Sequence, residues 1–374
     1  AFGSLAGGMA AQEASPQSGA PNGGEGHDER AGDEADICLA ACDLDKTVYP
    51  PAGPTQLSQL DANVRAMAAF EKTGGLAFPV TGNNISMAQV KFTIDGKVIR
   101  NLEGTPGIYM NGGLVLGPRG VELERHALGH LRLLADGRDF VTAILDFWDR
   151  GEDVLKDVGL LFFTPRELLG YDRGYANVEA YCAAQRIPHR LSARQEIVDQ
   201  REHILLLLVL FPVERAGKAL DYHEAIRPWQ AAVVGRLEAE GMTACKTAAP
   251  NPPDGVGSGV SMLIQQSPWP EIDVNVAGVD KGTALSRFLQ LPAVKDYLRM
   301  PRRSALVPAK HMAVFGDAAN DIPMFRAIGD SQPSVRVAMP HATDATLNAL
   351  ATERAEVSEV LQRLAAARAA KRRQ

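Results

Sequence analysis

The sequence predicts an α/β protein: a parallel β-sheet core that is interrupted by an inserted α+β domain. Three observations support this fold class. Short apolar runs end in polar residues near both ends of the chain, which is the pattern of strands buried in a parallel sheet. Helical patterns separate these runs, as they do in βαβ units. The chain has 374 residues, more than one core usually fills, and its middle part follows a different pattern.

The first βαβ unit is expected between residues 37 and 80. Residues 37–42 form a continuously apolar run, and residues 76–80 form a second one. Between them, apolar residues recur every three or four positions over 57–70, which predicts a helix that ends at Gly74-Gly75. Four candidate site residues follow the two strands: Asp43, Asp45, Thr81 and Gly82.

The inserted domain is expected at residues 114–270. Apolar runs alternate there with helical patterns, without the regular βα rhythm seen near the ends of the chain. The expected strands are 158–163, 204–211 and 260–264, and the expected helices are 139–150, 175–185 and 220–241.

After residue 275 the βα pattern returns. Lys281 begins a helical segment, and a strand is expected at 311–315. The last helix is expected at 357–370, and the basic residues at its end complement the negative pole of a helix. Three further candidate site residues follow the strand: Asp317, Asn320 and Asp321.

The composition argues against two classes of protein. Lys and Arg total 39 against 45 Asp and Glu, so the net charge is −6 and the chain lacks the positive field that non-specific nucleic-acid binding needs. The longest apolar run, residues 204–211, is far shorter than the roughly 20 residues that span a bilayer. Four scattered cysteines suit neither a disulfide framework nor a zinc site, so we expect buried free thiols in a reducing compartment.

The candidate site residues fit one chemistry if their strands belong to one sheet. Ligands of an open parallel sheet bind outside the carboxyl ends of its strands. Clustered carboxylates such as Asp43, Asp45 and Asp317 stay ionised together only beside a cation, and ligation by oxygen alone suits Mg²⁺. An ammonium group from Lys281 and a hydroxyl from Thr81 beside such a metal suit an anionic, tetrahedral group. Phosphoryl transfer is therefore the expected reaction.

The same residues resemble the four motifs of the haloacid dehalogenase superfamily. Asp43-Leu44-Asp45-Lys46-Thr47 resembles the first motif, Thr81-Gly82 the second, Lys281 the third and Gly316-Asp317-Ala318-Ala319-Asn320-Asp321 the fourth. Segments at 109–113, 271–285 and 320–342 are similar to elements of the Cof-type sugar-phosphate phosphatase branch. The resemblance covers the expected catalytic core, residues 36–113 and 271–350.

The resemblance implies a role for each of these residues. Asp43 would be the nucleophile that forms an aspartyl-phosphate, and Asp45 would be the general acid and base. Asp43, Asp317 and the backbone carbonyl of Asp45 would hold Mg²⁺. Asp321 would orient Lys281 or a metal-bound water. The residues that would bind the phosphate are Thr81, Gly82, Lys281 and Asn320.

The resemblance also implies a domain organisation. A Rossmann-like core is expected at 36–113 and 271–365, with a C2-type α+β cap at 114–270 that sets substrate specificity. Residues 1–35, rich in Gly, Ala, Ser and Pro, are expected to form a disordered tail, and residues 366–374 a basic C-terminal end.

The sequence departs from the family pattern at three places. Lys46 stands where Gly is commonest, and Asn83 stands where an Arg usually follows Thr-Gly. Residues 291–310 make a longer connection than expected between the third and fourth motifs, and their basic side chains favour a solvated insertion.

The predicted protein is a Mg²⁺-dependent phosphoric monoester hydrolase that acts on a small phosphorylated metabolite, such as a sugar phosphate. Two alternatives stay open: a hexose-phosphate mutase of the same superfamily, and a non-catalytic sensor that binds a sugar phosphate. Neither a nucleic acid nor a membrane is expected as a partner. We expect a monomer or homodimer in the cytoplasm, with an organelle left open because the sequence begins at Ala1.

Overall fold

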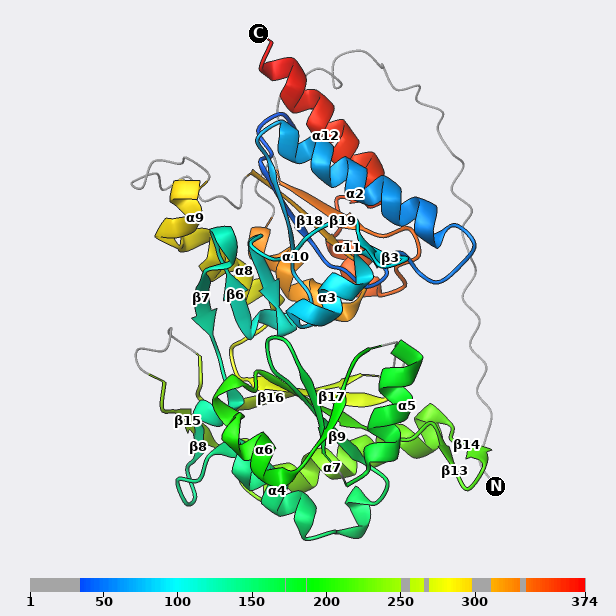
Figure 1. Ribbon diagram of the computed structural model, residues 1–374, viewed down its shortest axis with the longest axis vertical. Helices are drawn as coiled ribbons and strands as arrows, with labels where there is room; N and C mark the ends of the chain where they lie inside the picture. The colour runs from blue at the N-terminus through cyan, green and yellow to red at the C-terminus, as the bar shows by residue number, and fades with distance from the viewer. Residues whose placement is uncertain are drawn as a thin grey trace, which may run out of the picture.

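The structure of the chain, a computed structural model, describes residues 34–171, 173–185, 187–249, 256–265, 269–297, 311–329 and 334–373. It consists of two domains that follow one another along the long axis of the molecule, each built around a β-sheet (Figure 1). Most of the tail expected at 1–35 and of the insertion expected at 291–310 lies outside the described residues.

The first domain, the core, contains a five-stranded sheet in which all neighbouring strands are parallel. Across the sheet the strands are β2 (Leu76–Pro79), β1 (Leu39–Cys42), β18 (Met312–Gly316), β19 (Val335–Ala338) and β20 (Glu353–Arg354). The β1 strand is apolar and fully buried because helices cover both of its faces. Since β1 lies between β2 and β18, the residues that follow these three strands emerge side by side.

Helices cover the core sheet on both faces. On one face lie α2 (Gln56–Lys72) and α12 (Val357–Lys371), which pack against each other and bury Phe70 and Leu364 (Figure 1). On the other face lie α8 (Lys281–Gln290), α10 (Ile322–Ile328) and α11 (Ala345–Leu350). There Phe288 of α8 packs on Phe78 of β2, with ring centroids 4.9 Å apart.

The second domain, the cap, contains a six-stranded sheet. In order its strands are β11 (Arg190–Ser192), β10 (Leu168–Tyr171), β9 (Gly159–Phe163), β12 (Leu206–Leu210), β17 (Glu271–Val276) and β16 (Val260–Gln265). Neighbouring strands are antiparallel except β10 and β11, which are parallel. The predicted α+β character of the inserted domain is thus present.

The two faces of the cap sheet have different neighbours. Helices α4 (Phe140–Asp149) and α7 (Arg227–Ala239) pack on one face, and α5 (Tyr175–Gln185) packs on the other. The core domain lies beyond the face that carries α5 (Figure 1). Side chains of β17 that point to α4 and α7 are apolar, so the alternate residues of β17 face α5 and the core.

Both boundaries of the cap differ from the prediction. Strands β5 (Gly107–Tyr109), β6 (Leu114–Leu116) and β7 (Glu122–Arg125) form an antiparallel sheet, and Val115 belongs to the same apolar cluster as the core helices. The cap therefore begins after β7 rather than at residue 114. At its other end, β17 was expected in the core, but it pairs with β12 and β16 in the cap sheet because its alternating pattern suits a strand with one apolar face.

The ends of the core also extend beyond their predicted limits. Glu34, expected in the tail, forms an ion pair with Arg363 of α12 at 3.0 Å. Helix α12 runs past residue 365 to Lys371, and Arg368 donates a hydrogen bond of 2.8 Å to the carbonyl of Ile37. Part of the predicted basic end therefore fastens the last helix to the start of β1.

Apart from 3₁₀-helical turns such as Met110–Gly112, the remaining described elements are short. They are α3 (Ile85–Lys91), α6 (Arg194–Asp199), α9 (Pro292–Tyr297), a π-helical turn (Tyr222–Ile226), and three strand pairs: β3 (Thr93–Ile94) with β4 (Lys97–Val98), β8 (Leu131–Leu133) with β15 (Cys245–Thr247), and β13 (Glu214–Arg215) with β14 (Lys218–Ala219). All four cysteines are free, as expected. No helix within the described ranges is long and apolar enough to cross a bilayer.

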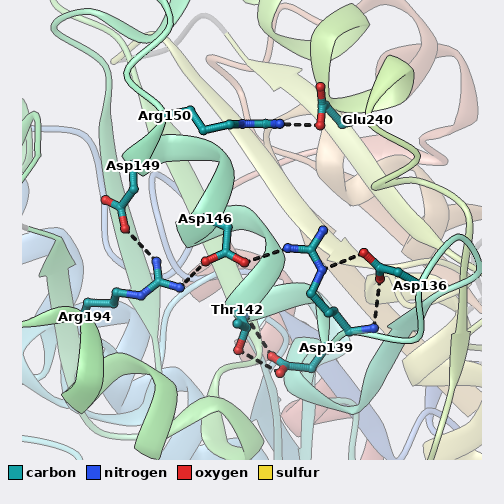
Figure 2. Close-up of polar contacts among 9 residues, drawn as sticks. Asp136, Asp139, Thr142, Asp146, Asp149, Arg150, Arg194 and Glu240 are labelled. Atoms are coloured by element: carbon teal, nitrogen blue, oxygen red, sulfur yellow. Dashed lines mark hydrogen bonds and ion pairs between the residues drawn. The ribbon is translucent and has the colours of Figure 1, made fainter.

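A network of ion pairs covers the outer surface of α4 (Figure 2). Asp146 accepts from both Arg138, at 2.6 Å, and Arg194 of α6. Arg194 also bridges to Asp149 at 2.7 Å, and so it joins α6 to two successive turns of α4. These side chains are partly exposed, and exposed pairs contribute only about 0–1 kcal/mol each. The network therefore adds little to the stability of the cap domain, which comes mainly from the apolar cluster beneath α4.

Candidate active site

Three neighbouring strands of the core end level with one another and bring the predicted residues together. Asp43 and Asp45 follow β1, Thr81 follows β2, and Asp317 follows β18. The register of β1 with its two neighbours aligns the three strand ends. The sheet is parallel, so all these side chains lie at its carboxyl edge, where ligands of such sheets bind.

Lys281 is positioned by the start of α8. The preceding residue, Asp280, caps the helix: its side chain accepts from the Thr283 N–H at 2.7 Å, and its own N–H donates to the Thr283 hydroxyl at 3.0 Å. At Gly282 a Cβ atom would lie 2.2 Å from the carbonyl oxygen of Pro323, so only glycine allows α8 to approach α10 this closely. The capped helix therefore holds the lysine stem in one place.

The ammonium group of Lys281 lies between two buried carboxylates. Its Nζ is 2.6 Å from Oδ1 of Asp43 and 2.7 Å from Oδ1 of Asp321, and the residue is only 1% exposed. Burial works against the charge of the lysine, but the two carboxylates outweigh it and raise its pKa above the ordinary value. Lys281 therefore carries a fixed positive charge inside the site.

Negative charge still exceeds positive charge around Lys281. Carboxylate oxygens of Asp43, Asp317 and Asp321 all lie within 4.8 Å of one another. Burial raises the pKa of Asp43 well above its ordinary value, and the carboxylates of Asp321 and Asp317 act in the same direction. Burial, followed by the charge of Asp321, raises the pKa of Asp317 to about 6. A bound cation would favour the ionised form of each carboxylate in this all-oxygen cluster, so the donor set fits a hard divalent metal.

The carboxylates of this cluster differ in how many hydrogen bonds they accept from the protein. Oδ1 of Asp321 accepts from Lys281, and Oδ2 accepts from the backbone N–H groups of Asp317 at 2.9 Å and Ala318 at 3.2 Å. Asp317 has weaker contacts, 3.5 Å from the Thr47 hydroxyl and 3.9 Å from His341. Both oxygens of Asp321 thus accept hydrogen bonds from the protein, while Asp43 and Asp317 keep oxygen atoms that could bind a metal.

The Thr81 loop is fixed by a turn in left-handed backbone conformation. Met110 and Asn111 have φ angles of 51° and 52°, and the Asn111 N–H donates to the carbonyl of Thr81 at 3.0 Å. A Cβ atom at Gly82 would lie 3.2 Å from Oδ1 of Asn111, so the glycine fits closely against this turn. The Thr81 hydroxyl accepts from the Asn83 N–H at 3.1 Å and from its amide at 2.9 Å.

Asp45 is held at both carboxylate oxygens. Asn83 donates to Oδ2 at 2.6 Å, and the ammonium group of Lys91, the last residue of α3, donates to Oδ1. Desolvation works against ionisation of Asp45, but the charge and hydrogen bond of Lys91, with the hydrogen bond of Asn83, outweigh it and lower its pKa. The Asp45 side chain stays 53% exposed, so a ligand can reach it.

A row of polar side chains lies on the face of β17 that does not contact α4 and α7. This row, the β17 polar row, consists of Glu271, Asp273 and Asn275, which are 9%, 3% and 6% exposed. Gln265 donates to Oδ2 of Asp273. One oxygen of each residue in the row is buried without a hydrogen-bond partner within the described part of the chain. Such oxygens require a donor, because an unpaired buried acceptor costs about 1–3 kcal/mol.

The β17 polar row faces the catalytic core. The positive charge of Lys281 acts on Asp273, and the charge of Asp45 acts on the neighbouring Tyr181 of α5. Burial raises the pKa of Asp273 to about 7, and burial together with Asp273 raises the pKa of Glu271 well above its ordinary value. The Asp273 carboxyl is therefore partly protonated near neutral pH, and it can both donate and accept hydrogen bonds.

Lys46 adopts the backbone conformation that makes glycine the usual residue at this position. Its φ angle is 57°, in the left-handed region where a Cβ atom is disfavoured. Its charge opposes the raised pKa of Asp317. The lysine thus adds positive charge near the cluster in exchange for local backbone strain.

The structure brings most of the predicted residues together and adds two features that the sequence did not reveal. Asn320 lies half-buried in the turn Ala319–Asp321 beside Asp317. Lys91 was missed because a lysine at a helix end is ordinary. The β17 polar row had a detectable signal, since polar and apolar residues alternate from Glu271 to Val276.

Comparisons with known proteins agree with this geometry. The family model for haloacid dehalogenase-like hydrolases matches residues 256–353, which include Lys281, Asp317 and Asp321. No curated protein matches the sequence.

Several solved structures share the fold of nearly the whole chain. A protein from Plasmodium vivax described as a HAD/COF-like hydrolase has a TM-score of 0.59 and 17% identity, over 90% of this chain and 98% of that one. A haloacid dehalogenase-like hydrolase from Bacteroides thetaiotaomicron has a TM-score of 0.55 and 15% identity, over 87% and 98%. A sugar phosphatase of HAD subclass IIB has a TM-score of 0.51 and 13% identity, over 89% and 98%. At such identities the likeness establishes the fold, and the family match covers the segments that carry the third and fourth motifs.

Proposed function

Because the chain has the haloacid dehalogenase fold and matches the haloacid dehalogenase-like hydrolases over residues 256–353, we propose that it is a Mg²⁺-dependent phosphatase of small phosphate monoesters. One observation carries this proposal: Lys281 joins Asp43 to Asp321, with Asp317 in the same cluster of oxygens. The arrangement provides a carboxylate nucleophile, a fixed cation and a place for a divalent metal, which phosphoryl transfer requires.

Asp43 is the proposed nucleophile. One of its oxygens accepts from Lys281, which leaves the other to attack phosphorus. The new bond joins Asp43 to phosphorus while the bond to the leaving oxygen breaks, which gives an aspartyl-phosphate. The Thr81 hydroxyl, Gly82, Asn320 and the Lys281 ammonium group are the proposed contacts of the phosphoryl oxygens.

Asp43 and Asp317 are the side chains that would hold Mg²⁺, together with the backbone carbonyl of Asp45. Their oxygens are hard ligands of the kind that Mg²⁺ prefers. When bound, the metal supplies charge neutralisation for the transferred phosphoryl group. Asp321 supports this arrangement by holding Lys281 and the N–H groups of the turn after β18.

Asp45 is the proposed proton-transfer group. Because Lys91 and Asn83 lower its pKa, Asp45 is ionised before the reaction, and it first takes up a proton from solvent, which its partial exposure allows. It then gives this proton to the leaving oxygen in the first step, so that an alcohol departs. It then takes a proton from the water that attacks the aspartyl-phosphate, which releases inorganic phosphate and restores Asp43. Its partial exposure supports this role, since the side chain must reach both the leaving group and water.

We further propose that the leaving group is rich in hydroxyl groups, as in a sugar phosphate. The β17 polar row has three buried oxygens without partners among the described residues, and it faces the core. Hydroxyl groups would donate to these oxygens and accept from the protonated carboxyls of the row. An apolar alcohol would leave the row unsatisfied, at about 1–3 kcal/mol for each group.

The test is a panel of phosphate esters with Mg²⁺, in which phosphate release is measured for the wild type and for Asp43→Asn. We expect hydrolysis of sugar phosphates that disappears in the variant. Conversion of one hexose phosphate into another without phosphate release would favour the mutase. Tight binding of a phosphate ester without any turnover would favour the sensor.

A further inference from the structure

Lys91 and Asn83 form a two-point clamp on Asp45. The two donors come from different parts of the segment after β2: Asn83 from the loop that follows Thr81, and Lys91 from the end of α3. Asn83 donates to one carboxylate oxygen at 2.6 Å, and Lys91 donates to the other. A carboxylate that accepts at both oxygens cannot turn about its final bond without losing a contact, so the clamp fixes its orientation.

Both donors of the clamp are themselves held in place. The Asn83 amide also donates to the Thr81 hydroxyl at 2.9 Å, which ties it to the end of β2. Helix α3 is capped by Asn84, whose side chain accepts from the Met87 N–H at 2.8 Å and donates to the carbonyl of Thr164, in the cap domain, at 3.2 Å. The Lys91 side chain is only 16% exposed, although Asp45 is 53% exposed. The donor is thus sheltered, while the face of Asp45 that a substrate would approach stays open.

We propose that Lys91 is a positioning residue: together with Asn83 it holds the Asp45 side chain in the orientation from which Asp45 passes a proton taken up from solvent to the leaving group. This inference rests on the proposed phosphatase function. It assigns Lys91 no contact with the phosphate and no proton of its own. Its entire effect passes through Asp45, and this distinguishes it from Lys281.

The first test compares two substrates in the first turnover, with Lys91→Met, which keeps most of the stem and removes the donor. An alkyl phosphate that the wild type hydrolyses needs a proton on its leaving oxygen, whereas p-nitrophenyl phosphate does not. Misplacing a catalytic group by about 1 Å can cost about 10²-fold. We therefore expect Lys91→Met to slow cleavage of the alkyl phosphate by about 10- to 100-fold and the first release of p-nitrophenolate by less than about threefold. Lys91→Arg, which keeps a donor, should recover part of the loss.

The second test is a double-mutant cycle with Asp45→Asn. If Lys91 acts only through Asp45, Lys91→Met should cause no further loss in the Asp45→Asn background. Lys97→Met, at an exposed position of β4, is the matched control and should leave the cleavage rates of both substrates unchanged. Thermal melts of each variant separate a folding defect from a kinetic one.

Binding of inorganic phosphate in the presence of Mg²⁺, measured by calorimetry, provides a readout that does not depend on turnover. Lys91→Met should bind inorganic phosphate as the wild type does, because the proposal gives Lys91 no contact with it. Weaker binding, equal slowing of both substrates, or an additional loss in the Asp45→Asn background would overturn the inference. If the wild type hydrolyses neither ester, the proposed function itself fails, and this result is distinct from all of those.

Discussion

The Nζ atom of Lys281 lies 2.6 Å from Oδ1 of Asp43, and both side chains are almost completely buried. The two residues are 238 positions apart in the sequence and are separated by the entire cap domain. This contact joins the end of β1 to the start of α8, and so it links the two segments of the core that flank the cap. It therefore has a structural consequence besides its proposed role in catalysis.

The structural consequence can be measured with Lys281→Met. Removing one member of a buried ion pair typically costs about 3–5 kcal/mol, because it leaves an uncompensated charge. We expect the free energy of unfolding to fall by about that amount in urea titrations without metal. Lys97→Met should leave it unchanged within about 0.5 kcal/mol. A loss as small as that of the control would mean that the contact does not hold the two segments together.

Replacement of Asp45 should separate the two chemical steps. Asp45→Asn keeps the backbone carbonyl but can no longer transfer a proton. Alkyl phosphates should be hydrolysed about 10²–10⁴-fold more slowly, and the first turnover of an activated aryl phosphate should be affected much less. Rapid-mixing kinetics with both substrates check this. An equal loss of rate with the alkyl and the aryl phosphate would mean that Asp45 does not transfer the proton.

Asp273 of the β17 polar row should affect how the free energy of unfolding depends on pH. The pKa of Asp273 is raised from 3.8 to about 7 in the folded chain. As pH rises from about 4 to about 7, the unfolded state loses this proton before the folded state does, so Asp273 lowers the free energy of unfolding across that window. Asp273→Asn cannot ionise, and relative to the wild type it should gain stability with rising pH, by at most about 4 kcal/mol. Urea titrations at several pH values test this, and parallel curves for the two proteins would contradict it.

Metal binding should depend on Asp317. Mg²⁺ bound only to the folded state should stabilise the wild type by about 2.7 kcal/mol at 100 times its Kd. Asp317→Asn removes one anionic ligand and should abolish most of the Mg²⁺-induced rise in Tm. Asp273→Asn, in the cap, should retain the rise. If Asp317→Asn responded to Mg²⁺ as the wild type does, the metal would lie elsewhere.

The core could be predicted from the sequence because its signals are local. A strand buried on both faces is apolar throughout, and the residues that follow it are polar, so the pattern around Asp43, Thr81 and Asp317 is visible without a structure. The helix that begins at Lys281 carries its own capping residue directly before it. Chemistry concentrated at strand ends and helix starts can be found in this way.

The cap boundaries and the Asp45 clamp could not be predicted because they depend on long-range pairing. Strand β17 lies shortly before Lys281 in the sequence, which suggested the core, yet its partners are β12 and β16. The contact of Lys91 with Asp45 joins residues 46 positions apart, and no local pattern marks it. Only the alternation of polar and apolar residues along β17 was present in the sequence, and it could have indicated a strand with one apolar face.

The central claim is that phosphate passes through Asp43. Asp45→Asn should accumulate the phosphorylated chain after mixing with substrate and Mg²⁺, because the attacking water lacks its base. Asp43→Asn should neither turn over substrate nor retain phosphate. Tandem mass spectrometry of the rapidly quenched proteins measures both. We predict covalent phosphate on Asp43 in Asp45→Asn and none in Asp43→Asn, and phosphate on any other residue would contradict the mechanism.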